Sequence, residues 1–461
     1  MNAVLSVVVV LISFFSSVYC QANEVLVPDN TNCSSLVAAV VDPYSSGGLY
    51  AEELRRRGFD QVIAVRSAEE FPVGYEASFK AGDFDSIVVH NDLKDPAKNL
   101  IVSELQKLKP RIVLIGAESG VWLGDALSER LGVLTNGTAL SLPRRNKFHL
   151  KQTLRQAGLS GARVTKQLYT NNVEEMIAWW KKEFQSKGIA RIVIKPPTSF
   201  GTQGVRFAHN EQEIRQAFHS IFGKRNDLLL INDEVLGEFY IPGTEYAVNG
   251  VVADGIVEIT DIWEYERDEV EGGATVYRRD TLIPYDGERQ RVLRAHAQEI
   301  VGPLGIKWGP VHIEMKIHPS DGFAEVVELA VRPCGANLPA LVKLATGTSQ
   351  IERAVDAYLQ EKSFVHRNGY TIKKNTSVVF LKASGDESKV MSRAKERVLR
   401  SLEGVHSVSF TYQDGQPMKK TRDSDTVLGV IELLHSDANV IEQTVQKIRD
   451  MEFSGDFERY R

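Results

Sequence analysis

The chain has 461 residues, of which 43% are hydrophobic and 25% are charged, which is ordinary for a globular protein. This length predicts roughly two to four domains. The net charge is −5, from 55 basic and 60 acidic residues, and no long basic run or ladder of aromatic and basic residues occurs. The composition therefore argues against nucleic acid as the main partner.

The first twenty residues predict a signal peptide. Residues 3–18 are almost wholly apolar, and a cut ahead of Gln21 would leave Val18 and Cys20 three and one places before it. The segment is short for a membrane span. We expect residues 1–20 to direct the chain to the secretory pathway, with no membrane association after the leader is removed. The alternatives are a hydrophobic anchor, a mis-started reading frame and a cytoplasmic protein.

Cysteine use and glycan acceptors depend on that targeting. If Cys20 leaves with the leader, Cys33 and Cys334 remain. The two alternatives are a disulfide between them and two free buried thiols. Asn32 and Asn136 begin Asn-X-Ser/Thr sequons, as does Asn375. The chain is a glycoprotein only if it enters a eukaryotic secretory pathway.

Residues 35–140 predict a Rossmann-like N-terminal domain. Apolar strands are expected at 36–41, 61–65, 86–90 and 112–116, with helical stretches between them, as at 96–108. Alternating strands and helices indicate a parallel sheet. GxGxxG is absent, so a dinucleotide-binding dehydrogenase is a poor second hypothesis.

The next segment carries a lysine and a glycine-rich loop. The short β-branched strand at 192–196 delivers Lys195, and the loop at 197–205 follows it. Glycine and hydroxyl residues let backbone N–H groups approach a phosphate. The residues of the loop expected to contact the phosphates are Ser199, Gly201, Thr202 and Gly204. Most such stretches are plain turns. The loop is not a Walker P-loop, because Lys195 precedes the glycines.

An apolar extended stretch follows a buried-looking run at 228–231. The carboxylates of Glu238 and Glu245 bound it. We expect its backbone to form hydrogen bonds with the edge of a purine and Glu245 to bind the ribose hydroxyls. The residues expected to line the base are Phe239, Tyr240 and Ile241.

Two acidic strands then predict a metal-binding hairpin. Residues 311–316 carry Glu314, a turn lies at 319–322, and the second strand carries Glu328. On neighbouring antiparallel strands both carboxylates face one side and can bridge Mg²⁺ to phosphate. Arg332 adds a fixed positive charge. The alternative is an exposed cross-strand salt bridge.

The order of these parts, with Lys147 ahead of them, resembles the ATP-grasp ligases, and among them the amino-acid ligases that form dipeptides. The resemblance also covers Val40 to Gly47, Gly116 to Val121, Thr260 to Trp263 and Leu282 to Asp286, and it spans about 35–455. It implies a multidomain α/β and α+β protein with an ATP-grasp fold. The expected parts are a lid at 145–235, a central subdomain at 236–360 and a C-terminal α+β domain at 370–461.

Secondary structure in these parts follows from the pattern of apolar residues. We expect a helix at 147–157 and a mixed sheet within 236–355. The tail predicts strands at 376–382, 405–412 and 426–434 and helices at 387–401 and 437–450.

The resemblance implies that a carboxylate attacks the γ-phosphate of ATP and that an amine then displaces phosphate from the acylphosphate, leaving ADP. Lys147 and Lys195 would contact the α- and β-phosphates, with Mg²⁺ or Mn²⁺ on Glu314 and Glu328. Arg332 would bind the acylphosphate. His312, two residues before Glu314, has either a direct role or a structural hydrogen bond.

The sequence departs from the family pattern at two places, which limits how far the family's residue roles apply to this chain. Ala330 stands where many ATP-grasp enzymes have a metal-binding Asn, and the small-residue run 333–337 leaves the shape of the acceptor pocket undefined. A carnosine-synthase-like or D-alanine:D-alanine-ligase-like activity, and a nucleotide-binding protein without turnover, are the alternatives. The expected partners are ATP and a small carboxylate and amine, and a homodimer is also open.

Overall fold

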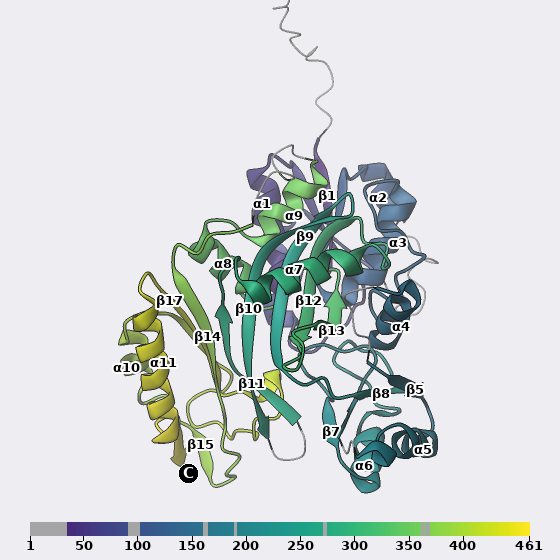
Figure 1. The fold of residues 1–461 in the computed structure, drawn as a ribbon. Helices are drawn as coiled ribbons and strands as arrows, with labels where there is room; N and C mark the ends of the chain where they lie inside the picture. The colour runs from purple at the N-terminus through teal and green to yellow at the C-terminus, as the bar shows by residue number, and fades with distance from the viewer. Residues whose placement is uncertain are drawn as a thin grey trace, which may run out of the picture. The chain divides into compact units, whose positions relative to one another are not determined.

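The computed structural model describes residues 35–90, 102–159, 165–188, 191–270, 274–360, 364 and 369–461. The expected leader, Asn32 and Cys33 lie outside these ranges. Residues 36–461 form one compact unit (Figure 1). Within the described residues no helix is long and apolar enough to cross a membrane.

A four-stranded parallel sheet begins the unit, in the order β3-β2-β1-β4. Its central strand β1 is wholly buried, because helices cover both faces and each face needs apolar side chains. The four strands predicted from the sequence are confirmed. The bounds are β1 Val37–Val41, α1 Leu49–Arg56, β2 Gln61–Arg66, β3 Ser86–Val89, α2 Val102–Leu108, β4 Ile112–Ile115 and α3 Val121–Leu131.

Helix α4, Lys147–Ala157, has the predicted bounds. Asn146 caps its first turn by accepting hydrogen bonds from the N–H groups of Phe148 and His149, and left-handed Gly158 ends it. The lid that follows is an antiparallel sheet in the order β5-β8-β6-β7, covered by two helices. Its elements are β5 Gln167–Thr170, α5 Val173–Glu183, β6 Ile192–Lys195, β7 Arg206–Ala208, α6 Glu211–Ile221 and β8 Val235–Phe239.

The largest sheet has eight strands in the order β13-β12-β9-β10-β11-β14-β17-β16. All seven pairings between its described strands are antiparallel, so the expectation of a mixed sheet is wrong. Connections of two to six residues join three of the seven neighbouring pairs, β9–β10, β10–β11 and β12–β13, and such connections impose antiparallel pairing. The strands are β9 Thr244–Ala253, β10 Ile256–Val270, β11 Ala274–Leu282, β12 Trp308–Ile317, β13 Ala324–Ala330, β14 Asn375–Leu381, β16 Val405–Phe410 and β17 Gly429–His435.

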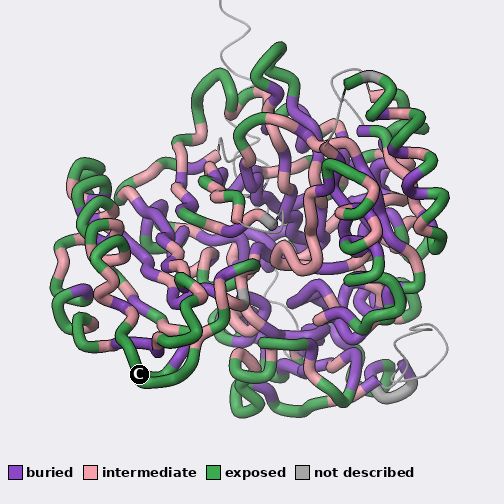
Figure 2. Tube along the Cα trace, turned by 90° about the horizontal axis from the view of Figure 1, so that it is seen from below, coloured by how far each residue is buried: buried purple, intermediate pink, exposed green. Residues whose placement is uncertain are grey.

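Helices close both faces of this sheet. Leu293 and Ala297 of α7 pack into its central core, and Ile351 and Val355 of α9 pack into a core shared with the N-terminal sheet. In Figure 2 the buried residues follow the interior strands and the exposed ones follow the outer helices and loops. The bounds are α7 Glu288–Val301, α8 Leu338–Thr346, α9 Gln350–Tyr358 and α11 Ala438–Phe453.

The expectation of a buried run at 228–231 is confirmed in part. The run is a turn with Leu229 in the left-handed region, where Leu228 and Leu229 are 2% and 8% exposed but Ile231 is 58% exposed. The expectation of a helix at 387–401 is wrong. In place of one helix at 387–401 the chain forms β15, Lys389–Met391, and the short α10, Glu396–Ser401. Strand β15 pairs with β18, Glu458–Tyr460, so a partner about seventy residues away overrides local helix propensity.

Arg144 joins the N-terminal part to the eight-stranded sheet. Its guanidinium is fully buried and forms an ion pair with Asp125 of α3 at 2.9 Å. It also donates to the carbonyls of Asn136 at 3.0 Å, Leu304 at 3.4 Å and Gly305 at 3.3 Å. One side chain therefore satisfies acceptors from three separate segments.

We predict that Arg144→Ala lowers the free energy of unfolding by about 3–5 kcal/mol, because it leaves the buried Asp125 carboxylate without its ion-pair partner and, among the described residues, with only the hydrogen bond from Ser141. Arg55→Ala is the control, since its pair with Asp85 is solvent-exposed and should contribute about 0–1 kcal/mol. Denaturant unfolding of both variants measures the difference. Equal losses would contradict the assigned role of Arg144.

Candidate active site

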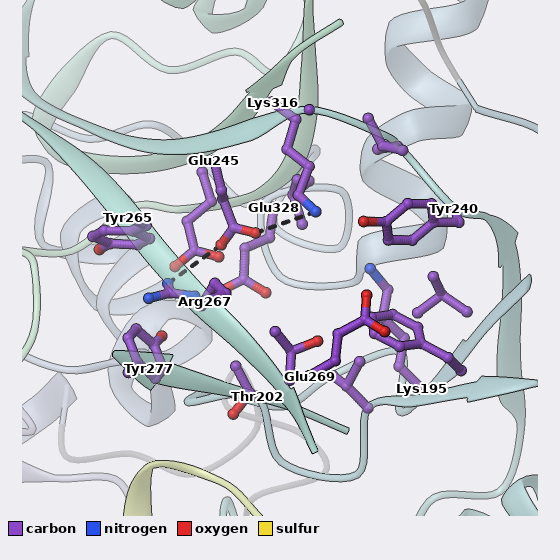
Figure 3. Close-up of a pocket in the computed structure, with 18 of the residues that line it drawn as sticks. Lys195, Thr202, Tyr240, Glu245, Tyr265, Arg267, Glu269, Tyr277, Lys316 and Glu328 are labelled. Atoms are coloured by element: carbon purple, nitrogen blue, oxygen red, sulfur yellow. Dashed lines mark hydrogen bonds and ion pairs between the residues drawn. The ribbon is translucent and has the colours of Figure 1, made fainter. Parts of the chain in front are cut away.

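A cavity of about 610 Å³ lies between the lid and the eight-stranded sheet (Figure 3). Strands β6 and β7, the 196–205 loop and the β8–β9 connection form one side, and β10 to β13 form the other. The residues selected from the sequence that line it are Lys147, Lys195, Ser199, Gly201, Thr202, Glu238, Phe239, Tyr240, Ile241, Glu245, Glu314 and Glu328. Gly204, His312 and Arg332 do not line it.

Glu314 and Glu328 form a cross-strand pair on β12 and β13, as predicted. Their side chains are only 13% and 19% exposed, so an exposed salt bridge is wrong. Burial raises the pKa of the Glu328 carboxyl, but the charges of Lys147, Lys195 and His312 outweigh it and lower that pKa. Lys147 Nζ lies 3.0 Å from Glu328 Oε2.

This pair suits a hard cation. Two carboxylates directly opposite each other repel, and a divalent ion between them removes that repulsion. No group of three or more His, Cys, Asp or Glu side chains that could hold a metal occurs among the described residues. The two glutamates would therefore supply only part of a coordination shell, and oxygens of a bound phosphate fit the remainder.

Lys195 and Glu238 form a buried ion pair at the lid side of the cavity. Lys151 Nζ lies 3.0 Å from the same carboxylate. Burial raises the pKa of Glu238, but the two lysines outweigh it and lower the pKa to about 2. Glu238 thus holds Lys195 in place. Strand β8 ends at Phe239 and β9 begins at Thr244. The segment between them belongs to neither strand and lines the cavity.

The glycine loop has the backbone expected of a phosphate loop. Gly201, Thr202 and Gly204 all have left-handed φ values, of 61°, 61° and 70°. The Thr202 hydroxyl is buried and finds no hydrogen-bond partner among the described residues, although Thr202 lines the cavity. A polar group in that state points to a ligand that completes the loop. Lys147 Nζ donates to the Ser199 carbonyl at 2.8 Å.

The same loop contacts two other parts of the molecule. Phe200 stacks on Tyr75 of the N-terminal part, with ring centroids 5.3 Å apart and planes 13° apart. Ser424 Oγ, near the C-terminal end, donates to the Gly201 carbonyl at 2.9 Å. The loop, whose residues 199–202 line the cavity, is therefore held by contacts on two sides.

Arg332 lies outside the cavity and is almost buried. Its Nε donates to Glu118 Oε2 at 3.0 Å, and Arg145 Nη1 donates to the other oxygen of Glu118 at 2.8 Å. The sequence did not indicate this partner, which lies 214 residues away. A direct catalytic role for Arg332 stays a prediction. His312 lies behind Glu314, with Nε2 3.4 Å from Glu314 Oε1, and its direct role also stays a prediction.

A cluster of charged and aromatic side chains on β10, β11 and β12 was not predicted from the sequence. The Arg267 guanidinium lies between the rings of Tyr265 and Tyr277, 4.1 and 3.5 Å from their centroids (Figure 3). It pairs with Glu245 at 3.3 Å, and Lys316 approaches the same carboxylate at 3.6 Å. Glu245 is thus already paired with two cations. No clear sequence signal marked this cluster, because Tyr265 follows the pattern of the apolar core and a register shift between Glu266 and Arg267 interrupts the period-two alternation.

Residues 189–338 match the ATP-grasp domain family. This part of the chain is similar to an ATP-grasp domain. Dapdiamide A synthase of Enterobacter agglomerans is 27% identical over 357 residues, covering 76% of this chain and 81% of that protein. Carbamoyl phosphate synthase large chain of Archaeoglobus fulgidus is 30% identical over 159 residues, which is 34% of this chain and 14% of that protein.

Solved structures show the ATP-grasp fold along most of the chain. An L-amino acid ligase from Bacillus licheniformis superposes with a TM-score of 0.67 and 18% identity, covering 91% of this chain and 98% of that one. A carboxyaminoimidazole ribonucleotide synthase from Aspergillus clavatus in complex with ATP gives a TM-score of 0.64 at 15% identity, covering 91% and 99%.

The pH dependence of stability tests the buried cluster. Burial raises the pKa of Asp280, which pairs with Arg267 at 3.0 Å, to about 7. Between about pH 4 and pH 7 the folded state keeps a proton that the unfolded chain has lost, so this group destabilises the fold increasingly as pH rises. We predict that Asp280→Asn becomes more stable than the wild type by up to about 1.4 kcal/mol per pH unit across this range.

Denaturant unfolding at several pH values measures this slope. Asp286→Asn is the control, because that side chain is 89% exposed and should leave the slope unchanged. Parallel pH profiles for wild type and Asp280→Asn would contradict the prediction.

Proposed function

We propose that the chain is an ATP-dependent carboxylate–amine ligase that joins two amino acids through an acylphosphate and releases ADP and phosphate. The observation that carries this proposal is the assembly of Lys147, Lys195 and the Glu314–Glu328 pair around one cavity beneath a glycine loop. The names of two relatives, dapdiamide A synthase and L-amino acid ligase, support the amide-forming reaction.

The cavity suits ATP along its length. The β8–β9 connection offers the backbone of Tyr240 and Ile241 to the purine, and Glu245 lies where β9 begins. Lys195 and Lys147 supply positive charge toward the phosphates. The unpartnered Thr202 hydroxyl and the left-handed loop backbone face the same volume.

Mg²⁺ held by Glu314 and Glu328 would neutralise charge on the transferred phosphoryl group. In the first step a substrate carboxylate oxygen attacks the γ-phosphorus, the bond to the β-phosphate oxygen breaks and ADP leaves. In the second step the amine nitrogen attacks the acyl carbon, phosphate leaves and the amine loses a proton. The protein contributes mainly by orienting reactants and stabilising charge.

The glycine loop protects the reaction from water. An acylphosphate is hydrolysed unless solvent is excluded, and the Phe200–Tyr75 stack and the Ser424 contact hold the loop at the cavity. Arg332 is proposed to stabilise the charge that develops at the acyl group. Its guanidinium carries two hydrogen bonds on Nε and Nη1, which fix its plane.

A screen of amino-acid pairs tests the function. We predict ATP-dependent phosphate release with at least one pair, and a product in mass spectrometry whose mass equals the two amino acids less water. Glu328→Gln should abolish phosphate release while the protein stays folded, because it removes metal-binding charge and keeps the shape of a side chain that is 19% exposed. Unchanged turnover in Glu328→Gln would contradict the metal assignment, and a wild type without amide product would contradict the ligase.

Arg332 distinguishes a ligase from a binding protein. We predict that Arg332→Lys lowers turnover at least about a hundredfold while ATP affinity changes little, because a point charge cannot replace a planar fork in the transition state. Arg145→Lys is the matched control, since it weakens the same Glu118 salt bridge. Equal losses in both variants, confined to thermal stability, would show that Arg332 is structural.

A further inference from the structure

A line of buried polar side chains lies behind Glu314. Asp261 of β10, Asn249 of β9 and His312 of β12 are 0%, 0% and 6% exposed. Asn249 Nδ2 donates to Asp261 Oδ1 at 2.5 Å, Asn249 Oδ1 lies 2.7 Å from His312 Nδ1, and His312 Nε2 lies 3.4 Å from Glu314 Oε1. The line thus connects the sheet interior to a carboxylate of the cavity.

The sheet register builds this line. Asn249 is the cross-strand neighbour of both Asp261 and His312, so three adjacent strands place the three side chains in one row. A break in register between Ile259 and Asp261 brings Asp261 opposite Asn249. Bulges of this kind re-aim a side chain and often lie next to active sites.

The hydrogen bonds fix the orientation of every group in the line. Asp261 also accepts from Trp263 Nε1 at 2.7 Å and from Thr260 Oγ1 at 2.8 Å, so its carboxylate is held by three donors. Because the amide nitrogen of Asn249 donates to Asp261, its carbonyl faces His312, and Nδ1 must carry the proton. The imidazole is therefore locked, with Nε2 as the edge that faces Glu314.

We propose that Asp261 and Asn249 are positioning residues for Glu314 and act on it through the ring of His312. The inference rests on the proposed function only in taking Glu314 as a metal ligand. Glu328 opposite Glu314 repels it, and the locked ring limits how far the Glu314 carboxylate can turn away. His312 then needs no contact with substrate, which agrees with its place outside the cavity.

Metal affinity tests the proposal without any need for turnover. Mn²⁺ binding to the full-length protein with ATP is measured by electron paramagnetic resonance, and ATP binding without metal is measured by calorimetry. Asn249→Ala should weaken Mn²⁺ binding about ten- to a hundredfold, the range that is usual when a residue that orients a metal ligand from outside the coordination shell is lost. ATP affinity without metal should stay unchanged.

Asn136→Ala is the matched control. Asn136 also anchors β12, through the N–H groups of Lys307 and Trp308 at 2.7 and 2.8 Å, but at the opposite end of the strand from Glu314. It should lower stability and leave Mn²⁺ affinity unchanged. Should Asn249→Ala fail to fold, the isosteric Asp261→Asn serves in its place and should weaken Mn²⁺ binding in the same direction.

Every outcome of these measurements supports or overturns the positioning role of Asn249 and Asp261. Wild-type Mn²⁺ affinity in the folded variant, or an equal loss in Asn136→Ala, overturns the positioning role. A wild type that binds no Mn²⁺ with ATP overturns it as well. A wild type that binds Mn²⁺ with ATP but forms no amide overturns the proposed function, and the positioning role then stands on the binding data alone.

Discussion

The repulsion between Glu314 and Glu328 is the constraint on which the rest of the site depends. Antiparallel pairing of β12 and β13 sets the two carboxylates opposite each other, where charges of one sign oppose folding. Lys147, at 3.0 Å from Glu328, offsets part of this repulsion, and the oriented ring of His312 lies beside Glu314. Lys147 belongs to α4 and His312 to β12 itself, where Asn249 of β9 orients its ring, so the hairpin and its surroundings specify one another.

Cations and anions alternate through the remainder of the cavity. Lys195 is shared with Glu238, Arg267 with Glu245 and Asp280, and these groups are almost completely buried. Pairing removes the cost of an isolated buried charge, which would otherwise be several kcal/mol. An incoming polyphosphate therefore meets side chains that are already oriented, and it has to compete with carboxylates for their charge.

Local signals in the sequence were sufficient for the parts that are local in the fold. The cap at Asn146 and the glycine at 158 set the bounds of α4, and the 319–322 turn between two acidic strands gave the hairpin. What the sequence could not show depends on partners distant along the chain. The Glu118 partner of Arg332 and the row through Asn249 arise only when separate strands and domains meet. The 387–401 expectation failed for the same reason, because β15 is specified by β18.

The course of the eight-stranded sheet has a consequence for how this protein can be shortened or fused. Strand β14 pairs with β11, so the last ninety or so residues continue the sheet that carries Arg267 and Glu314 (Figure 1). Removing them would turn β11 into an open edge that is free to pair with other chains. The same cut would take away Ser424 and with it one of the two contacts on the glycine loop. The C-terminal part is therefore a poor place for truncation, and any exchange with a relative's tail has to preserve the β11–β14 register.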